Sequence, residues 1–274
     1  MIASLSAKNC ASNKKAIGIF DSGVGGLTVM RQIHAALPYE NICYFGDTAR
    51  VPYGNKSPET IKKYARENAR FLQDQNIKIL VVACNTACAL ATDLHSYVDV
   101  PLIGVIEPGV RHAVESTRSG SIAVLGTKGT ISSGAYQERL KAALPEAKIF
   151  AAACPLLVHV VEEQLFTHAA TRLLIEEYTA PLMKNSPDTV ILGCTHYPLL
   201  QPLFQEILGE DIILIDPAYS TALAVQQKLR ALDQLNSGPE KGSCAFFVSD
   251  DVLKFKETGE LFFQRSLDKV TLKI

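Results

Sequence analysis

Two cysteines, Cys84 and Cys194, stand in a setting that suits proton transfer. Each follows a run of apolar residues and precedes hydrogen-bonding residues, Asn85-Thr86 in one case and Thr195-His196 in the other. Most buried cysteines are inert small hydrophobes. A free thiol titrates near about 8.5, so a cysteine that acts as a base at neutral pH needs polar or charged neighbours. His196 is such a neighbour, and it is also a candidate to exchange protons with a substrate or to orient its carboxylate.

A glycine-rich segment, Asp21-Ser22-Gly23-Val24-Gly25-Gly26-Leu27-Thr28, follows the apolar run 16–20. Glycines permit a tight turn and leave backbone N–H groups free to meet an anion at a helix N-terminus. The segment does not fit a nucleotide loop, because it lacks the Walker lysine and has Thr28 at the third glycine position of the dinucleotide fingerprint. Asp21, where the run ends, is a candidate proton-transfer group. The alternative is an ordinary strand-to-helix turn that needs small residues.

Two further segments have the composition of loops that line sites. Residues 45–56 form a polar stretch with Pro, Gly and Asn, and residues 126–130 carry threonine hydroxyls that suit a carboxylate. Both segments are equally compatible with plain connecting loops.

The other cysteines show no chemical setting. The count of seven is odd and no CxxC pair occurs, which argues against a disulfide framework, a zinc ribbon and a thioredoxin-type site. Cys88 lies four residues beyond Cys84 and is interpreted as packing, since an isolated pair at this spacing is a thin metal site. We therefore expect no metal. The remaining cysteines, interpreted as structural, are Cys10, Cys43, Cys154 and Cys244.

The elements that must position these residues are short apolar runs separated by longer amphipathic stretches. Nearly continuous Val, Ile and Leu are typical of strands buried on both faces, so the runs predict a parallel sheet with helices on each side. The runs cover 16–20, 77–83, 101–106, 122–125, 189–192 and 212–215.

The clearest helix is predicted to begin at Ser57. Ser57 is its expected N-cap, Pro58 occupies the first helical position and an acid follows in the first turn. One face carries Ile61, Ala65, Ala69 and Leu72, and the helix is expected to end at Gln75-Asn76.

The order of these elements suggests an internal doubling. We predict a first α/β domain over 16–110, a second over 111–216, and a C-terminal part, 217–274, that completes the first. Each half would then carry one cysteine at the carboxyl end of a strand, which is where ligands bind in open α/β sheets.

Composition restricts the class of protein. The chain has 274 residues, of which 47% are hydrophobic and 20% charged, with a formal net charge of −1. This balance argues against disorder, coiled coil and nucleic-acid binding through a broad basic surface. No apolar run approaches the roughly 20 residues that cross a bilayer. The polar stretch 1–15 lacks the apolar region of a signal peptide. We expect a soluble cytoplasmic protein with no membrane partner.

In combination, the motifs resemble the glutamate racemase family, within the cofactor-independent aspartate/glutamate racemase superfamily. Their order and spacing match over nearly the whole chain from residue 16. The matching segments are IGIFDSGVGGLTV at 17–29, YFGDTARVPYGNKS at 44–57, VVACNTA at 81–87, IGVIEPG at 103–109, VLGTKGTI at 124–131, CPLLVHVVEE at 154–163 and LGCTHYPLL at 192–200.

This resemblance implies two pseudo-symmetric α/β domains with mainly parallel sheets and an active site in the cleft between them. It implies racemisation without pyridoxal phosphate or metal, with Cys84 and Cys194 on opposite sides of the substrate Cα. Asp21 would assist Cys84, while His196 and Glu162 would assist Cys194. The substrate-binding residues it implies are Asp21, Ser22, Pro52, Tyr53, Gly54, Asn85, Thr86, Thr130, Thr195 and His196.

The resemblance further implies L-glutamate as substrate, D-glutamate for peptidoglycan synthesis as product, and a possible homodimer. Two positions depart from the usual pattern: His159 stands where Pro is more common, and Gln164 where Gly usually follows the paired glutamates. Both bear on the start of the segment that carries Glu162.

Three alternatives stay open. The chain is compatible with an aspartate racemase and with another superfamily member such as a hydantoin racemase or a decarboxylase. A decarboxylase usually keeps one cysteine, whereas this chain has both. The third alternative is a non-catalytic module that binds a small ligand on the same scaffold.

Overall fold

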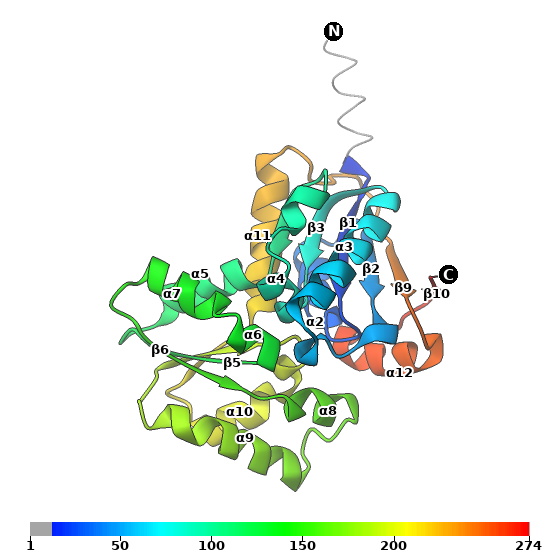
Figure 1. The fold of residues 1–274 in the computed structure, drawn as a ribbon. Helices are drawn as coiled ribbons and strands as arrows, with labels where there is room; N and C mark the ends of the chain where they lie inside the picture. The colour runs from blue at the N-terminus through cyan, green and yellow to red at the C-terminus, as the bar shows by residue number, and fades with distance from the viewer. Residues whose placement is uncertain (1–12, 274) are drawn as a thin grey trace.

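The structure is a computed structural model that describes residues 13–273. Cys10 and most of the polar stretch 1–15 therefore lie outside the described residues. Figure 1 shows two lobes, each built around a sheet with helices packed on it.

All strand pairs in both sheets are parallel, as the continuous apolar runs predict. The larger sheet has the order β10-β9-β2-β1-β3-β4, and the smaller has the order β6-β5-β7-β8. The strands are β1 Ala16–Asp21, β2 Ile42–Gly46, β3 Ile77–Val82, β4 Leu102–Gly104, β5 Ser121–Gly126, β6 Lys148–Ala153, β7 Thr189–Gly193, β8 Ile213–Ile215, β9 Cys244–Val248 and β10 Val270–Leu272.

Helices connect the strands and cover the sheets (Figure 1). The α-helices are α2 Leu27–Ala36, α3 Pro58–Asp74, α4 Asn85–Leu90, α5 Ile106–Ser116, α6 Lys128–Ser132, α7 Ala135–Ala143, α8 Leu156–Glu162, α9 Ala169–Met183, α10 Gln201–Leu208, α11 Pro217–Ala231 and α12 Val252–Phe263. Short 3-10 helices cover Thr48–Arg50, Tyr53–Asn55, Leu94–Tyr97 and Tyr197–Leu200.

The α/β class with mainly parallel sheets is confirmed. The C-terminal strands β9 and β10 join the larger sheet next to β2, so the chain returns to its first sheet after completing the second. The domain division, with boundaries at 110 and 216 and with 217–274 completing the first domain, stays a prediction.

The helix predicted from Ser57 is α3. The Ser57 hydroxyl accepts a hydrogen bond from the Thr60 N–H at 3.3 Å, and Pro58 is the first helical residue. The four apolar residues of the predicted face are fully buried. The N-cap, the proline and the apolar spacing are all short-range features of the chain. The sequence alone therefore predicts the helix that they define.

Two predictions of secondary structure were wrong in part. The run 101–106 forms a strand only over Leu102–Gly104, and Ile106 begins α5 instead. Apolar runs do not distinguish a buried strand from the buried start of a helix. In the segment 45–56, interpreted as a loop, Phe45 and Gly46 belong to β2.

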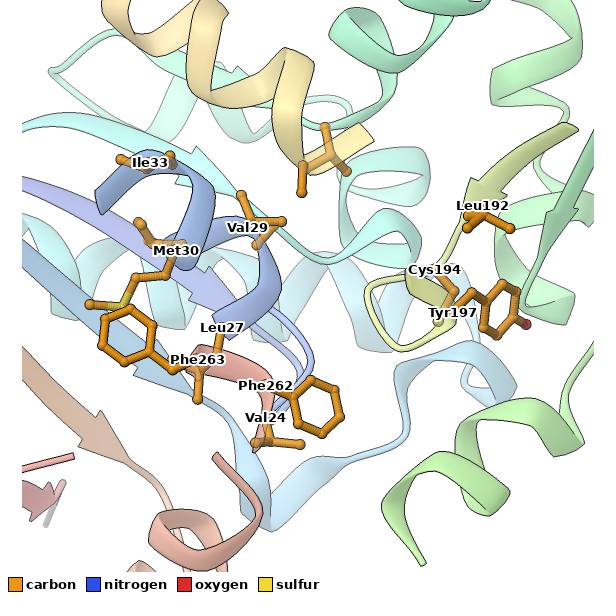
Figure 2. Close-up of a cluster of buried hydrophobic side chains, with 14 of the residues drawn as sticks. Val24, Leu27, Val29, Met30, Ile33, Leu192, Cys194, Tyr197, Phe262 and Phe263 are labelled. Carbon is orange, nitrogen blue, oxygen red and sulfur yellow. The ribbon is translucent and has the colours of Figure 1, made fainter. Parts of the chain in front are cut away.

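One continuous apolar core crosses between the lobes. Figure 2 shows side chains of α2 and α12 on one side and, facing them, Leu192, Cys194 and Tyr197 from the end of β7. This packing places the loop after β7 directly against the first lobe.

Candidate active site

Cys84 and Cys194 come from different sheets and face one cavity. Cys84 follows β3 and is the N-cap residue of α4, and Cys194 directly follows β7. Both are buried, with 5% and 6% of their surface exposed, and both line the same small space between the lobes. The carboxyl ends of the two parallel sheets thus point at one another, as ligand sites in such folds require.

The structure brings most of the predicted site residues together around this cavity. Those that line it are Ser22, Pro52, Tyr53, Gly54, Cys84, Asn85, Thr86, Cys194, Thr195 and His196. Three others, Asp21, Thr130 and Glu162, do not line it and act on residues that do. Sequence reasoning did not single out Val51 or Val158 as lining residues, and it placed Thr127 only in a loop of interest.

Cys84 is held as a neutral thiol. Its Sγ donates to the Ser22 hydroxyl at 3.7 Å. Burial, with a smaller contribution from the charge of Asp21, raises the pKa of Cys84 to about 12. At neutral pH this group is therefore a proton donor.

Asp21 lies beneath this side of the cavity, fully buried at the end of β1. Its Oδ2 accepts from the Gly23 N–H at 3.0 Å, and its Oδ1 has no hydrogen-bond partner among the described residues. Burial raises the pKa of Asp21, although the charge of His196 and nearby backbone N–H groups oppose the rise. A buried oxygen without a partner is costly unless a ligand supplies a donor.

Cys194 lies next to His196, which in turn is paired with Glu162. Its Sγ lies 3.9 Å from Nδ1 of His196, and Nε2 of His196 lies 3.1 Å from Oε1 of Glu162. Burial lowers the pKa of His196, but its hydrogen bonds to Cys194 and Glu162 outweigh burial and raise that pKa overall. Burial likewise raises the pKa of Glu162, but His196 outweighs it and lowers that pKa overall. Both shifts favour the pair imidazolium and carboxylate, with the imidazole ring 3.9 Å from Sγ of Cys194.

The two departures from the family pattern leave this pair in place. Helix α8 begins at Leu156, ahead of His159, and ends at Glu162. Gln164, where Gly is usual, adopts a φ of 58°, in the left-handed region. The glutamate therefore reaches His196 without Pro at 159 or Gly at 164.

A cluster of hydroxyls joins the two lobes at the cavity. Oγ1 of Thr86 lies 2.8 Å from Oγ1 of Thr127 and 3.3 Å from that of Thr130. Nearby, the Tyr136 hydroxyl donates to Oδ1 of Asn85 at 2.7 Å, which orients the amide of that residue. These groups are hydrogen-bond donors of the kind that hold a carboxylate.

Hydrogen bonds on the side away from the cavity hold the loop that carries Tyr53 and Gly54. The Tyr53 hydroxyl donates to Asp47 and accepts from Nδ2 of Asn68 at 3.0 Å. Asp47 also accepts from Nε of Arg50 at 2.9 Å. Sequence reasoning missed this support, because Asn68 lies on α3 and meets the loop only in the folded chain.

Residues 13–273 show neither a metal-binding cluster nor a membrane-spanning helix. In that range no group of three or more His, Cys, Asp or Glu is arranged to hold a metal ion. The helices described there are each too short or too polar to cross a bilayer.

Comparisons with known proteins agree with this geometry. The sequence pattern of the Asp/Glu/Hydantoin racemase family matches residues 17–226. The chain is 48% identical over 257 residues to a glutamate racemase of Geobacter metallireducens, covering 93% of this chain and 95% of that one.

Two solved structures are also similar. Glutamate racemase isoform RacE1 from Bacillus anthracis superposes with a TM-score of 0.91 at 39% identity, covering 95% of this chain and 97% of that one. Glutamate racemase from Francisella tularensis in complex with D-glutamate superposes with a TM-score of 0.90 at 35% identity, covering 96% of this chain and 98% of that one. With the matched sequence, fold and cavity taken together, the chain belongs to the Asp/Glu/Hydantoin racemase family.

Proposed function

We propose that this protein interconverts L- and D-glutamate with Cys84 and Cys194 as the two proton carriers. The observation that carries the proposal is that one thiol from each sheet lines a single buried cavity. Inversion at a carbon requires a base on one face and an acid on the other, and two thiols supply both in either direction. Relatives named glutamate racemase, at up to 48% identity, support glutamate as the substrate.

In the proposed reaction, a thiolate takes the α-proton of glutamate, so that an S–H bond forms as the Cα–H bond breaks. The electron pair stays on the planar carbanion, delocalised into its carboxylate. The opposite thiol then gives its proton to the other face, which inverts Cα and leaves a thiolate. The raised pKa of Cys84 favours the thiol form of that residue, and the raised pKa of His196 favours an imidazolium beside Cys194.

The α-proton of glutamate is only weakly acidic, so the surrounding groups must stabilise the charges of the substrate and of its carbanion. The threonine hydroxyls and Asn85 are placed for a carboxylate, whereas Asp21 lies beneath the cavity and contributes its charge beside Cys84. Preorganised dipoles in a site without bulk water are worth more than the same groups in solution. A role in peptidoglycan supply, a cytoplasmic location and a homodimer stay predictions.

Racemisation itself is tested first. The optical rotation of L-glutamate and of L-aspartate is followed in D₂O, without added pyridoxal phosphate or metal. We expect decay with glutamate, with deuterium appearing at Cα. If the optical rotation decays with aspartate alone, the substrate is aspartate and the proposed two-thiol reaction still applies. No exchange with either, from folded and reduced protein, would favour a different substrate of the superfamily or the non-catalytic binding module.

The two thiols are tested next by Cys84→Ala and Cys194→Ala. Each is expected to lower racemisation by at least about 10³-fold, because one face of Cα then lacks a proton carrier. Cys88→Ala is the matched control, since Cys88 is a free cysteine one turn along α4 and outside the cavity. Near wild-type turnover in either of the first two variants would refute the role of that cysteine.

A further inference from the structure

The substrate cavity is closed in this structure and is flanked by two wider cavities. The closed cavity has about 20 Å³ available to water centres, roughly the room of one water molecule. A cavity of about 650 Å³ adjoins it and shares Gly54 as a lining residue. Another, of about 240 Å³, adjoins it through Val51. Glutamate is far larger than one water, so the closed cavity must open to admit it, and these two cavities are the candidate routes that share lining residues with it.

The two flanking cavities differ in charge. The larger one, which we term the lysine opening, is lined by Lys56, Lys128 and His159, and no acidic residue is among the described residues that line it. The smaller one, termed the acidic opening, is lined by Lys254 and three acids, Glu162, Asp250 and Asp251. Glu162 is paired with His196, so Asp250 and Asp251 against the single ammonium of Lys254 leave the acidic opening with a net negative charge.

We propose that glutamate enters and leaves through the lysine opening, with Lys56 and Lys128 attracting its carboxylates. This inference rests on the proposed function. Glutamate carries two carboxylates and one ammonium, so its net charge at neutral pH is −1. A cleft lined by one sign of charge concentrates the opposite ion and raises the rate of productive encounter. The acidic opening repels the same ion.

The boundary between the lysine opening and the closed cavity supports this route. It consists of small residues of opposite lobes in direct contact. A Cβ on Gly54 would lie 2.6 Å from Cβ of Thr127, and a Cβ on Gly129 would lie 3.0 Å from Cγ2 of Thr86. The backbone oxygen of Gly54 is 3.3 Å from that same Gly129 position. Separation of the lobes at this contact would join the closed cavity to the lysine opening.

The test is the double variant Lys56→Gln/Lys128→Gln, assayed for glutamate racemisation over a range of ionic strength. We expect kcat/KM to fall about three- to tenfold at low salt, with kcat nearly unchanged, because the lysines act before the chemical step. The loss should shrink to less than about twofold near 0.5 M salt, where charges beyond about 4 Å are screened.

Two controls make the result specific. Lys148→Gln/Lys228→Gln removes the same charge from exposed positions outside both openings and should leave kcat/KM within about twofold. Asp250→Asn removes one carboxylate from the acidic opening and should also have little effect. A rise in kcat/KM for Asp250→Asn, with no fall for the lysine pair, would assign entry to the acidic opening and overturn the proposal.

The two proposals fail in distinguishable ways. A wild-type protein that does not exchange the α-proton of glutamate refutes the function and this inference with it. A racemising wild type whose lysine variant keeps its kcat/KM and its salt dependence refutes the entry route alone. An equal loss of kcat at every salt concentration would show that the lysines act on chemistry, which also contradicts the proposal.

Discussion

Residue by residue, the two thiols have unlike surroundings. Cys84 contacts a neutral hydroxyl and lies near the carboxylate of Asp21, both within the first lobe. Cys194 contacts His196, which is paired with Glu162. The Cys194 side of the cavity thus holds an ion pair, whereas the Cys84 side holds a hydroxyl and a buried carboxyl. For a racemase with an equilibrium constant of one, this asymmetry changes the kcat of each direction while the two kcat/KM values remain equal.

The pair with Glu162 leads to a prediction about pH. Glu162 raises the pKa of His196, so Glu162→Gln should lower it. The alkaline fall of kcat, where His196 loses its proton, should therefore move to lower pH by at least about one unit. The measurement is kcat against pH. Glu163→Gln, which removes the adjacent exposed carboxylate, is the control and should leave the profile in place. An unchanged alkaline limb in Glu162→Gln would contradict the pairing.

Among the elements, α8 shows how a short helix serves the site. It spans Leu156–Glu162, buries Leu157, Val158 and Val161, and presents its last residue to His196. Val158 on the same helix lines the cavity, so the apolar stripe both anchors the helix and shapes the site.

The end of α8 carries backbone strain that can be relieved. Gln164 has a φ of 58°, which costs a residue with a Cβ about 1–2 kcal/mol and costs glycine nothing sterically. Glycine also has more conformational freedom in the unfolded chain, and the entropy it loses on folding offsets part of the relieved strain. Gln164→Gly should therefore stabilise the fold by up to about 1 kcal/mol. Urea denaturation measures this change.

Its control is Gln226→Gly within α11 (Pro217–Ala231), where the backbone is helical. There glycine should destabilise by about 1 kcal/mol. Equal destabilisation in both variants would refute the strain at Gln164.

For the whole molecule, closure of the two lobes forms the site. The closed cavity of about 20 Å³ admits no glutamate, so binding requires the lobes to separate and then to meet again around the substrate. Residues without side chains allow that close approach. Gly54 meets Thr127, and Gly25 packs against Thr195 and His196.

Gly54→Ala tests the need for closure. The added methyl would lie 2.6 Å from Cβ of Thr127, so the lobes cannot meet as they do here. We expect racemisation to fall about 10²-fold, as misplacement by about 1 Å does elsewhere, with little change in melting temperature. Gly238→Ala is the control, because its nearest neighbour is Oδ1 of Asn236 at 3.3 Å, far from the cavity. Full activity of Gly54→Ala would show that this contact is not needed.

A buried ion pair contacts the segment through which the chain returns to its first sheet. Nζ of Lys78 lies 2.5 Å from Oε2 of Glu40, and their side chains are 1% and 2% exposed. The same Nζ donates to the backbone oxygen of Gln234 at 2.7 Å, and Oε1 of Glu40 accepts from the Asn236 N–H at 2.7 Å. The pair therefore fastens the segment between α11 and β9 to the first lobe.

Breaking this pair should destabilise the protein strongly. Lys78→Met leaves the carboxylate of Glu40 buried and without its cation, which costs about 3–5 kcal/mol of unfolding free energy. Lys78→Met/Glu40→Leu removes both charges, so its free energy of unfolding should fall by less than that of Lys78→Met. Guanidinium denaturation measures both variants. A double variant less stable than the single one would contradict the account.

The local features were predictable from sequence, because short-range chemistry decides them. Parallel strands, the cap at Ser57, and the positions of Cys84 and Cys194 after apolar runs all follow from residues within one or two turns of each other. The motif resemblance added the residues that surround the thiols. It also added Glu162, whose role has no local signal.

What only the tertiary structure decided depends on contacts between distant segments. The place of β9 beside β2, the support of Tyr53 by Asn68, and the lining by Val51 and Val158 have no pattern in the sequence. The charge difference between the two openings is of the same kind, since Lys56 and Lys128 come from different lobes. Side-chain type is a property of the chain, whereas a cavity and its electric field are properties of how separate elements pack.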